Sequence, residues 1–228
     1  MAEADLIRER YLRRAQLPPG RYSPFNRGNL FIVQQRERLL LKMLAASGLA
    51  ELGQRRILEI GCGDGYWLRK FVEYGAAPGN LSGVDLLEDR VARGCQLSPN
   101  INLSLANAEH LGFRDRSFDI VLQSTVFSSI LDPSMRVNVA REMVRVLRDD
   151  GRIIWYDFRY DNPANPDVRG ICRREVRGLF PRCPIEFRRT TLIPPLARRL
   201  GPVSWGICEL LSLVPTLLSH ELAVIRKP

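Results

Sequence analysis

A short apolar run leads into a turn that carries three glycines at alternate positions and two acidic residues. Residues 57–65 read ILEIGCGDG, so the carboxylates of Glu59 and Asp64 flank Gly61 and Gly63. Glycine has no Cβ, which permits positive φ angles and lets the backbone approach a ligand closely. Two carboxylates would repel a pyrophosphate, whereas they suit a ligand with an ammonium and a sulfonium group. The segment therefore predicts a nucleoside site for a cationic ligand.

A third acid lies where the ribose of such a ligand would bind. Residues 81–85 form a predicted strand that ends in Asp85, about two dozen residues after Gly61, close to the separation expected of a ribose-binding carboxylate. A carboxylate at this point can accept hydrogen bonds from both ribose hydroxyls. The order of strand, glycine turn, helix, strand and acid indicates a doubly wound α/β sheet.

Three further strands are predicted, at residues 101–105, 117–124 and 151–157. The third is followed by NAEHLGF at residues 107–113, and the fourth contains FDIV at residues 118–121. These segments complete an ordered set whose spacing is difficult to obtain by chance.

The set resembles the motifs of the class I S-adenosylmethionine-dependent methyltransferases. The family's first motif, E/D-x-G-x-G-x-G, corresponds to residues 59–65, and its F-D-x-V strand corresponds to residues 118–121. Its adenine segment, D-A-E-x-L-P-F, corresponds to residues 107–113, with Asn107 in place of the usual Asp. The amide oxygen of Asn107 can still accept a hydrogen bond from the adenine amino group, without charge.

The resemblance implies an α/β fold with a doubly wound, seven-stranded, mostly parallel sheet (Rossmann-like) whose last strand is antiparallel. It also implies an N-terminal helical lid and a helical cap in the final hairpin. The cofactor would be S-adenosylmethionine, with S-adenosylhomocysteine as product and no metal. The implied cofactor-binding residues are Glu59, Gly61, Cys62, Gly63, Asp85, Leu86, Asn107, Ala108, Glu109, Gln123 and Ser124.

Composition favours one folded domain. The 228 residues are 45% hydrophobic and 26% charged, which is ordinary for a globular chain. We expect residues 1–228 to form a single domain, with residues 1–54 as the lid, 55–157 as the cofactor-binding core and 158–228 as the acceptor-side cap and last strands. The five scattered cysteines and two histidines suggest neither a disulfide framework nor a zinc site. The charged N-terminus does not resemble a signal peptide, so we expect a cytoplasmic protein.

Two segments outside the core are expected to approach the methyl acceptor. The first is a proline-rich loop at residues 18–29, where Tyr22 and Arg27 would belong to a lid, followed by an amphipathic helix from about Leu30 to Leu49. Packing of this arm without ligand contact is the alternative.

The second segment follows the fifth strand. Ligands bind outside the carboxyl ends of the strands in open α/β sheets, so Asp157, Arg159 and Tyr160 should emerge at the acceptor end, with Phe127 after the fourth strand. The alternative for Asp157 and Arg159 is ion pairing with a neighbouring basic helix.

About two dozen residues, 193–219, separate the last two predicted strands, at Phe187 to Leu192 and at His220 to Arg226. Residues 203–218 are almost wholly apolar, yet they are shorter than the roughly 20 residues of a membrane-spanning helix and are interrupted by Glu209 and Pro215. The insertion should cap the acceptor pocket. It either packs on the body, binds an apolar acceptor, or makes a peripheral membrane contact.

The chain carries a net charge of +9, and nine arginines gather between residues 169 and 199 in the C-terminal third. A basic face can be merely solvated, or it can attract nucleic acid, anionic lipid or an acidic substrate. Nucleic acid is disfavoured because the chain shows no RNA-binding module. The family's N/D-P-P-Y/F segment for amino methylation is also replaced here by Gln123-Ser124-Thr125-Val126-Phe127.

A sulfonium methyl is already activated, so the protein must align the acceptor and, for a hydroxyl group, remove its proton. Two candidate bases are His220, at the start of the last strand, and Asp157. His110 is interpreted as structural. A nucleophilic acceptor such as a carboxylate would need no base.

The leading hypothesis is methyl transfer from S-adenosylmethionine to a small or lipid-linked metabolite, mainly O-methylation of a natural product, sugar or glycan. One alternative is an RNA methyltransferase that uses the arginine-rich face. Another is a non-catalytic partner protein that binds the nucleoside. Either a monomer or a homodimer is compatible with the sequence.

Overall fold

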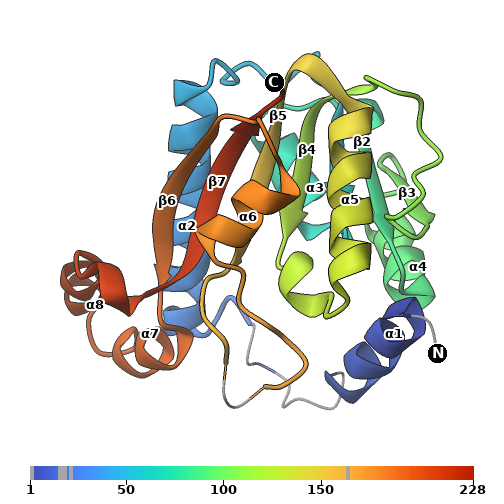
Figure 1. The fold of residues 1–228 in the computed structure, drawn as a ribbon. Coiled ribbons are helices and arrows are strands. Elements are labelled where there is room, and N and C mark those ends of the chain that lie inside the picture. Colours follow the sequence, from blue (N-terminus) through green and yellow to red (C-terminus); the bar gives the residue numbers. More distant parts are fainter. Residues whose placement is uncertain (1–2, 15–19, 21–22, 163–164) are drawn as a thin grey trace.

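The sheet is the centre of the structure, a computed structural model that describes residues 3–14, 20, 23–162 and 165–228 (Figure 1). Within these residues seven strands lie in the order β3-β2-β1-β4-β5-β7-β6. The first five strands are mutually parallel, and β7 is antiparallel to both of its neighbours. The predicted fold class is confirmed. The strands are β1 (Ile57–Ile60), β2 (Leu81–Asp85), β3 (Asn102–Leu105), β4 (Phe118–Ser124), β5 (Leu147–Phe158), β6 (Ile185–Leu192) and β7 (Leu218–Arg226).

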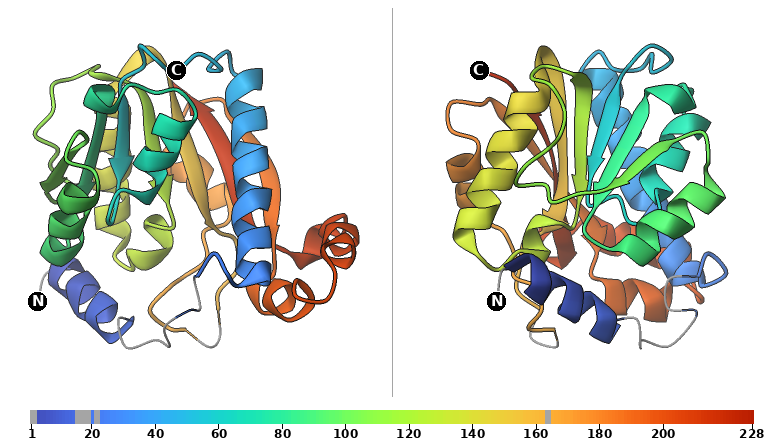
Figure 2. Two further views of the ribbon diagram at one scale, coloured as in Figure 1. Left: turned by 180° about the vertical axis from the view of Figure 1, so that it is seen from behind. Right: turned by 90° about the vertical axis from the view of Figure 1, so that its right-hand side faces the viewer.

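Helices cover both faces of the sheet (Figure 2). The side chains of a strand point alternately to opposite faces, so Ile57 and Leu58 of β1 enter two different cores. The core with Ile57 is closed by α2 (Arg27–Ala46) and α3 (Tyr66–Glu73). The core with Leu58 is closed by α5 (Pro133–Val146) and α6 (Arg173–Leu179), while α4 (Glu88–Leu97) packs beside β2 and β3. We call these the α2 face and the α5 face.

The second helix begins earlier than the sequence pattern predicts. It starts at Arg27 rather than near Leu30 because the side chain of Asn26 accepts hydrogen bonds from the backbone N–H groups of Gly28 and Asn29. Such a cap satisfies two donors that the first helical turn leaves without intrahelical partners. The helix ends at Ala46, before Gly48 adopts a positive φ of 73°.

The fifth strand is longer than predicted. It begins at Leu147, which pairs with Phe118, and its register against β4 shifts before Arg152 pairs with Ile120. The irregularity lies between these two pairs, so the observed strand starts four residues before the predicted start at residue 151. Strands β6 and β7 each begin two residues before the predicted start.

Three helical segments lie at the end of the sheet where the parallel strands terminate (Figures 1 and 2). They are α1 (Glu3–Arg14) from the N-terminal region, and α7 (Pro194–Leu200) and α8 (Trp205–Ser212) from the insertion between β6 and β7. Because β7 is antiparallel, its first residues lie at this same end, opposite the last residues of β5. In the described part of the chain, the helices are too short or too polar to cross a bilayer.

Candidate functional site

A cavity of about 140 Å³ lies at the carboxyl ends of β1, β2 and β4. Its floor includes the backbone of Gly61 and the side chain of Asp85, and Ser124 borders it at the end of β4. Ile7 and Tyr11 of α1 contribute to its wall. The position agrees with the general rule that ligands bind beyond the carboxyl ends of strands in open α/β sheets.

The glycine turn adopts a backbone conformation that other residues rarely accept. Gly61, Gly63 and Gly65 have φ angles of 65°, 55° and 78°. A Cβ on Gly61 would lie 2.4 Å from Cγ2 of Val126, in the loop after β4. Glycine is therefore required at position 61 both for its positive φ and for the close approach of the two loops.

Asp85 is joined directly to this turn. Its Oδ2 accepts a 2.8 Å hydrogen bond from the N–H of Gly63, and its Oδ1 accepts a 2.9 Å bond from the N–H of Leu87. The side chain is only 8% exposed and lines the cavity. Each carboxylate oxygen keeps a further lone pair, so Asp85 can still accept from ligand hydroxyls.

Glu59 lies buried beneath the turn and has capacity for a cationic partner. The residue is 2% exposed, and within the described structure its Oε2 has no hydrogen-bond partner. Burial raises the pKa of Glu59 well above its usual range, the charge of Asp85 adds to this, and Arg36 opposes it. A buried carboxylate with an unsatisfied oxygen is costly unless a ligand completes it.

Arg36, which the sequence reasoning did not select, lies beside this site through its contact with Ser124. It extends from α2, and its guanidinium carbon lies 4.1 Å from the ring centroid of Trp67 and 4.9 Å from that of Tyr156. Its Nη1 donates a 3.5 Å hydrogen bond to Ser124 Oγ, and its Nε is buried with no partner in the described residues. A signal did exist: Arg36 interrupts the buried stripe of Ile32 and Leu40 at intervals of four residues.

The predicted adenine segment contributes to the cavity mainly through its alanines. Ala106 and Ala108 line the cavity, as does Leu86 after β2. The side-chain oxygen of Asn107 accepts from the N–H of Glu109 at 3.0 Å, and its Nδ2 donates to the Glu109 carboxylate at 3.2 Å. These two side chains thus shape the loop.

Gln123 and Cys62 are turned away from the cavity. The buried Gln123 amide donates to the carbonyl oxygen of Tyr156 at 3.3 Å and accepts from the N–H of Val126 at 3.1 Å. It thereby fixes the loop that follows β4. The Cys62 side chain belongs to the core of the α2 face, which leaves its backbone as the part available to a ligand.

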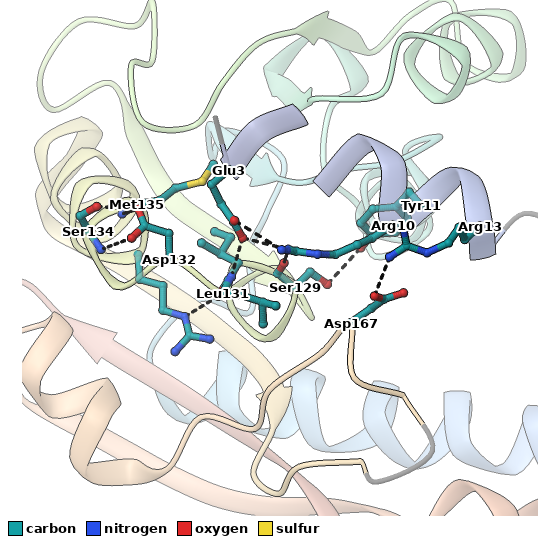
Figure 3. A network of polar contacts seen from close by, with 12 residues as sticks. Glu3, Arg10, Tyr11, Arg13, Ser129, Leu131, Asp132, Ser134, Met135 and Asp167 are labelled. Atoms are coloured by element: carbon teal, nitrogen blue, oxygen red, sulfur yellow. Dashed lines mark hydrogen bonds and ion pairs between the residues drawn. The ribbon is translucent and has the colours of Figure 1, made fainter. Parts of the chain in front are cut away.

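The first helix is fastened over the cavity by a set of polar contacts (Figure 3). Glu3 accepts from the N–H of Leu131 at 2.7 Å and pairs with Arg10 at 2.9 Å. Arg10 also donates to the carbonyl oxygen of Ser129 at 3.2 Å, and the Tyr11 hydroxyl lies 3.3 Å from Ser129 Oγ. We call this set the α1 latch. It supports the prediction that the N-terminal segment covers the site.

The two predicted catalytic residues lie on opposite faces of the sheet. His220 pairs with Phe158 across β5 and β7, whereas Asp157 pairs with Glu221. His220 stacks on Tyr156 with 4.7 Å between ring centroids, and its Nδ1 lies 2.9 Å from Ser219 Oγ. Burial, followed by the charge of Arg36, lowers the pKa of His220 to about 3.

Asp157 is buried on the α5 face. Its Oδ2 accepts from the N–H of Ser128 at 3.1 Å, and its Oδ1 accepts from the N–H of Phe158 at 2.9 Å. Burial raises the pKa of Asp157 to about 6, against the opposing effect of these hydrogen bonds and of Arg136. The Asp157 carboxyl group therefore ionises about one pH unit below neutral pH.

The predicted acceptor and lid residues occupy varied positions. Arg27 is exposed and donates to the carbonyl oxygen of Pro202, whereas Phe127 is buried with its ring 4.3 Å from that of Trp155. Arg159 donates to the carbonyl oxygen of Leu218 at 3.3 Å, and its guanidinium covers the half-exposed ring of Tyr160. Tyr22 lies outside the described residues.

Comparisons with known proteins place the central part of the chain in a recognised group. Residues 57–151 match the family described as Methyltransferase domain. Methyltransferase GfsG of Streptomyces halstedii is 32% identical, with 75% of this chain and 66% of that protein covered. A phthiotriol/phenolphthiotriol dimycocerosates methyltransferase of Mycobacterium ulcerans is 31% identical, with 56% of this chain and 49% of that protein covered. The chain spans about half to two thirds of the length of these relatives.

The fold also matches solved structures. An S-adenosylmethionine-dependent methyltransferase from Mesorhizobium loti superposes with a TM-score of 0.61 at 20% identity, covering 81% of this chain and 96% of that one. At this identity the likeness shows the shared fold alone.

Proposed function

The chain belongs to the class I S-adenosylmethionine-dependent methyltransferases, and we propose that it transfers the methyl group of this cofactor to an oxygen of a small or lipid-linked metabolite. The relative named for phthiotriol and phenolphthiotriol dimycocerosates supports the lipid-linked end of this range. A natural product, sugar or glycan hydroxyl is the acceptor class that the proposal covers.

The observation that carries the proposal is the unsatisfied Oε2 of Glu59 beneath a glycine turn that is itself bonded to Asp85. These groups fit S-adenosylmethionine. Glu59 would hold the ammonium group, Asp85 the ribose hydroxyls, and the wall around Ala106 and Ala108 the adenine. The guanidinium of Arg36 would hold the carboxylate of the methionine part. When bound, the cofactor supplies a methyl group already activated by its sulfonium.

Proton removal from the acceptor is assigned to one of two groups on different faces of the sheet. Asp157 has a pKa of about 6, which suits a base that works near neutrality. His220 is neutral at pH 7 and accepts a proton weakly, given its pKa of about 3. We therefore propose Asp157 as the base for an acceptor bound toward the α5 face. His220 would orient an acceptor bound toward the α2 face.

Ion pairing weakens the RNA alternative. Several arginines of the C-terminal third are engaged by acids of the same protein, as in the pairs Arg169–Glu175, Arg173–Glu221 and Arg188–Glu186. A nucleic-acid-binding face needs cations that are available to phosphates. The arginine-rich segment accordingly supports structural pairing more than RNA recognition.

Incubation with methyl-labelled S-adenosylmethionine and a cell extract tests the proposal. We expect label in a small metabolite or in the lipid fraction, and loss of that label with the Glu59→Gln variant. Label that appears in RNA would support the alternative instead. Binding of S-adenosylhomocysteine without transfer to any fraction would support a non-catalytic role.

A further inference from the structure

The helix α8 is apolar on the side that faces the body and also on the side that faces solvent. Cys208 is buried against the protein, and Trp205 packs edge-on to Phe31 of α2. On the outer side, Leu210 is 68% exposed and Leu213 is 77% exposed, with Ile207 partly exposed beside them. A surface helix of a globular protein normally places polar residues on its solvent side. The outer side of α8 is therefore adapted to an environment other than water.

Two further exposed apolar side chains lie on the segments that precede α2 and α8. Phe25, in the loop before α2, is 94% exposed, and Val203, just before α8, is 74% exposed. The two segments are joined because Arg27 donates a 2.9 Å hydrogen bond to the carbonyl oxygen of Pro202. Gly28 also packs directly against the backbone of α7. We call the exposed apolar residues of these joined segments, Phe25, Val203, Ile207, Leu210, Leu213 and Val214, the apolar tip.

The apolar tip lies at the acceptor end of the molecule. The insertion that carries it leaves the sheet at the end of β6 and returns at the start of β7, where Phe158 of β5 pairs with His220. Figure 1 shows α8 projecting beyond the edge of the sheet, at the same end as α1 and α7. A flat surface can therefore contact the tip, and such contact would bring the acceptor end of the protein toward that surface.

The charges around the tip identify the kind of surface. Exposed Arg27 and Arg199 lie in the segments that flank it. Glu209 is the acid of α8, and it is paired with Arg38 at 2.5 Å. The whole chain carries a net charge of +9, which opposes self-association and favours an anionic surface. Apolar side chains bordered by arginines are the combination that binds the headgroup region of anionic bilayers.

From these contacts and charges we propose that the apolar tip docks the protein onto an anionic lipid bilayer, with Leu210 and Leu213 entering the headgroup and acyl boundary. The docking requires no particular methyl acceptor and goes beyond the proposed reaction. It would give the acceptor end access to molecules dissolved in or anchored to the membrane.

Sedimentation with lipid vesicles tests this docking. The full chain is mixed with vesicles of phosphatidylcholine alone or of phosphatidylcholine with phosphatidylglycerol, at low and at high salt. We expect binding to the anionic vesicles that weakens as salt rises, and at least about tenfold weaker binding to the neutral vesicles. The double variant Leu210→Ser/Leu213→Ser should lower the partition coefficient by about tenfold or more, because each serine removes most of the apolar area of a leucine.

A matched control separates the tip from general hydrophobicity. Leu97, at the end of α4, is 52% exposed at the opposite edge of the sheet, so Leu97→Ser should bind vesicles as the wild type does. S-adenosylhomocysteine affinity, measured on every variant, shows that the fold is intact and tests the cofactor site separately from docking. Equal vesicle binding by the double variant and the wild type would overturn the proposal. So would a concentration-dependent dimer, seen by light scattering, that the double variant abolishes while vesicles bind neither protein.

Discussion

The N–H of Gly63 donates a 2.8 Å hydrogen bond to Oδ2 of Asp85, which joins the glycine turn to the end of the second strand. The carboxylate is thus held in place by the same loop whose backbone forms the floor of the cavity. Loss of either partner would change both the turn and the position of the Asp85 carboxylate, the group proposed to bind the ribose. The two sequence motifs therefore act as one structural unit.

The Glu59→Gln variant should be more stable than the wild type in the absence of ligand, and it should bind the cofactor more weakly. Burial raises the folded-state pKa of Glu59 above its ordinary value of 4.5, so the folded state holds the proton more tightly than the unfolded state. Stability is then lost as pH rises from about 4.5 toward the raised pKa, and glutamine removes this loss. The melting temperatures of the wild type and the variant should differ above about pH 5, where the variant melts higher, and should become equal below about pH 4. A variant that is less stable at neutral pH would contradict this account of Glu59.

The Arg36→Ala variant should bind S-adenosylhomocysteine about ten- to a hundredfold more weakly. A charge-assisted contact to the amino-acid carboxylate contributes about 1.5 to 3 kcal/mol to binding. Adenosine, which lacks that carboxylate, should bind the variant and the wild type equally. Isothermal calorimetry with both ligands makes the comparison. Arg38→Ala is the matched control, because Arg38 lies on the same helix and pairs with Glu209 at the surface. An equal loss for adenosine would show that Arg36 acts through packing.

Glu3→Ala should accelerate ligand release. The Glu3 carboxylate accepts from the N–H of Leu131 and pairs with Arg10, so its removal opens the α1 latch. We expect S-adenosylhomocysteine to dissociate about tenfold faster, which corresponds to about 1.4 kcal/mol. Stopped-flow displacement measures the rate, with Glu9→Ala on the same helix as control. Unchanged release would mean that α1 does not limit access to the cavity.

Asp157→Asn should reduce turnover and remove a pH dependence. If Asp157 accepts the proton, the activity of the wild type rises with pH through about 6, where the Asp157 carboxyl group ionises. The asparagine variant should show a flat profile and a loss of about a hundredfold or more, with unchanged cofactor affinity. His220→Ala should keep the rise near pH 6, because the pKa of His220 is about 3. Full activity of both variants would show that the acceptor needs no base.

The glycine turn and the acid at the end of β2 could be predicted from sequence because their determinants are local. The positive φ of Gly61 and the acid at the end of β2 both follow from short segments whose strand, turn and helix pattern is visible in the chain. The same holds for the order of the first five strands, since parallel strands with helical crossovers follow few topologies.

The acceptor end could not be predicted in this way because it depends on register and tertiary packing. Whether His220 and Asp157 share a face is decided by the pairing of β5 with β7 across some sixty residues, and a shift of one residue would reverse the outcome. The place of Arg36 among Trp67 and Tyr156 likewise arises from the docking of α2 on the sheet. The sequence signal for Arg36 was its position as a charged residue between the buried residues Ile32 and Leu40 of the same helix.

Calorimetric titration of S-adenosylhomocysteine into the wild type and into Asp85→Ala tests the central claim most directly. We predict saturable single-site binding to the wild type and an affinity about 30-fold lower in the variant, from the loss of about 2 kcal/mol of hydrogen bonding to a charged group. Asp89→Ala, an exposed acid on α4, should bind as the wild type does. Absence of binding to the wild type, or equal affinity in Asp85→Ala, would contradict the assignment of this cavity to S-adenosylmethionine.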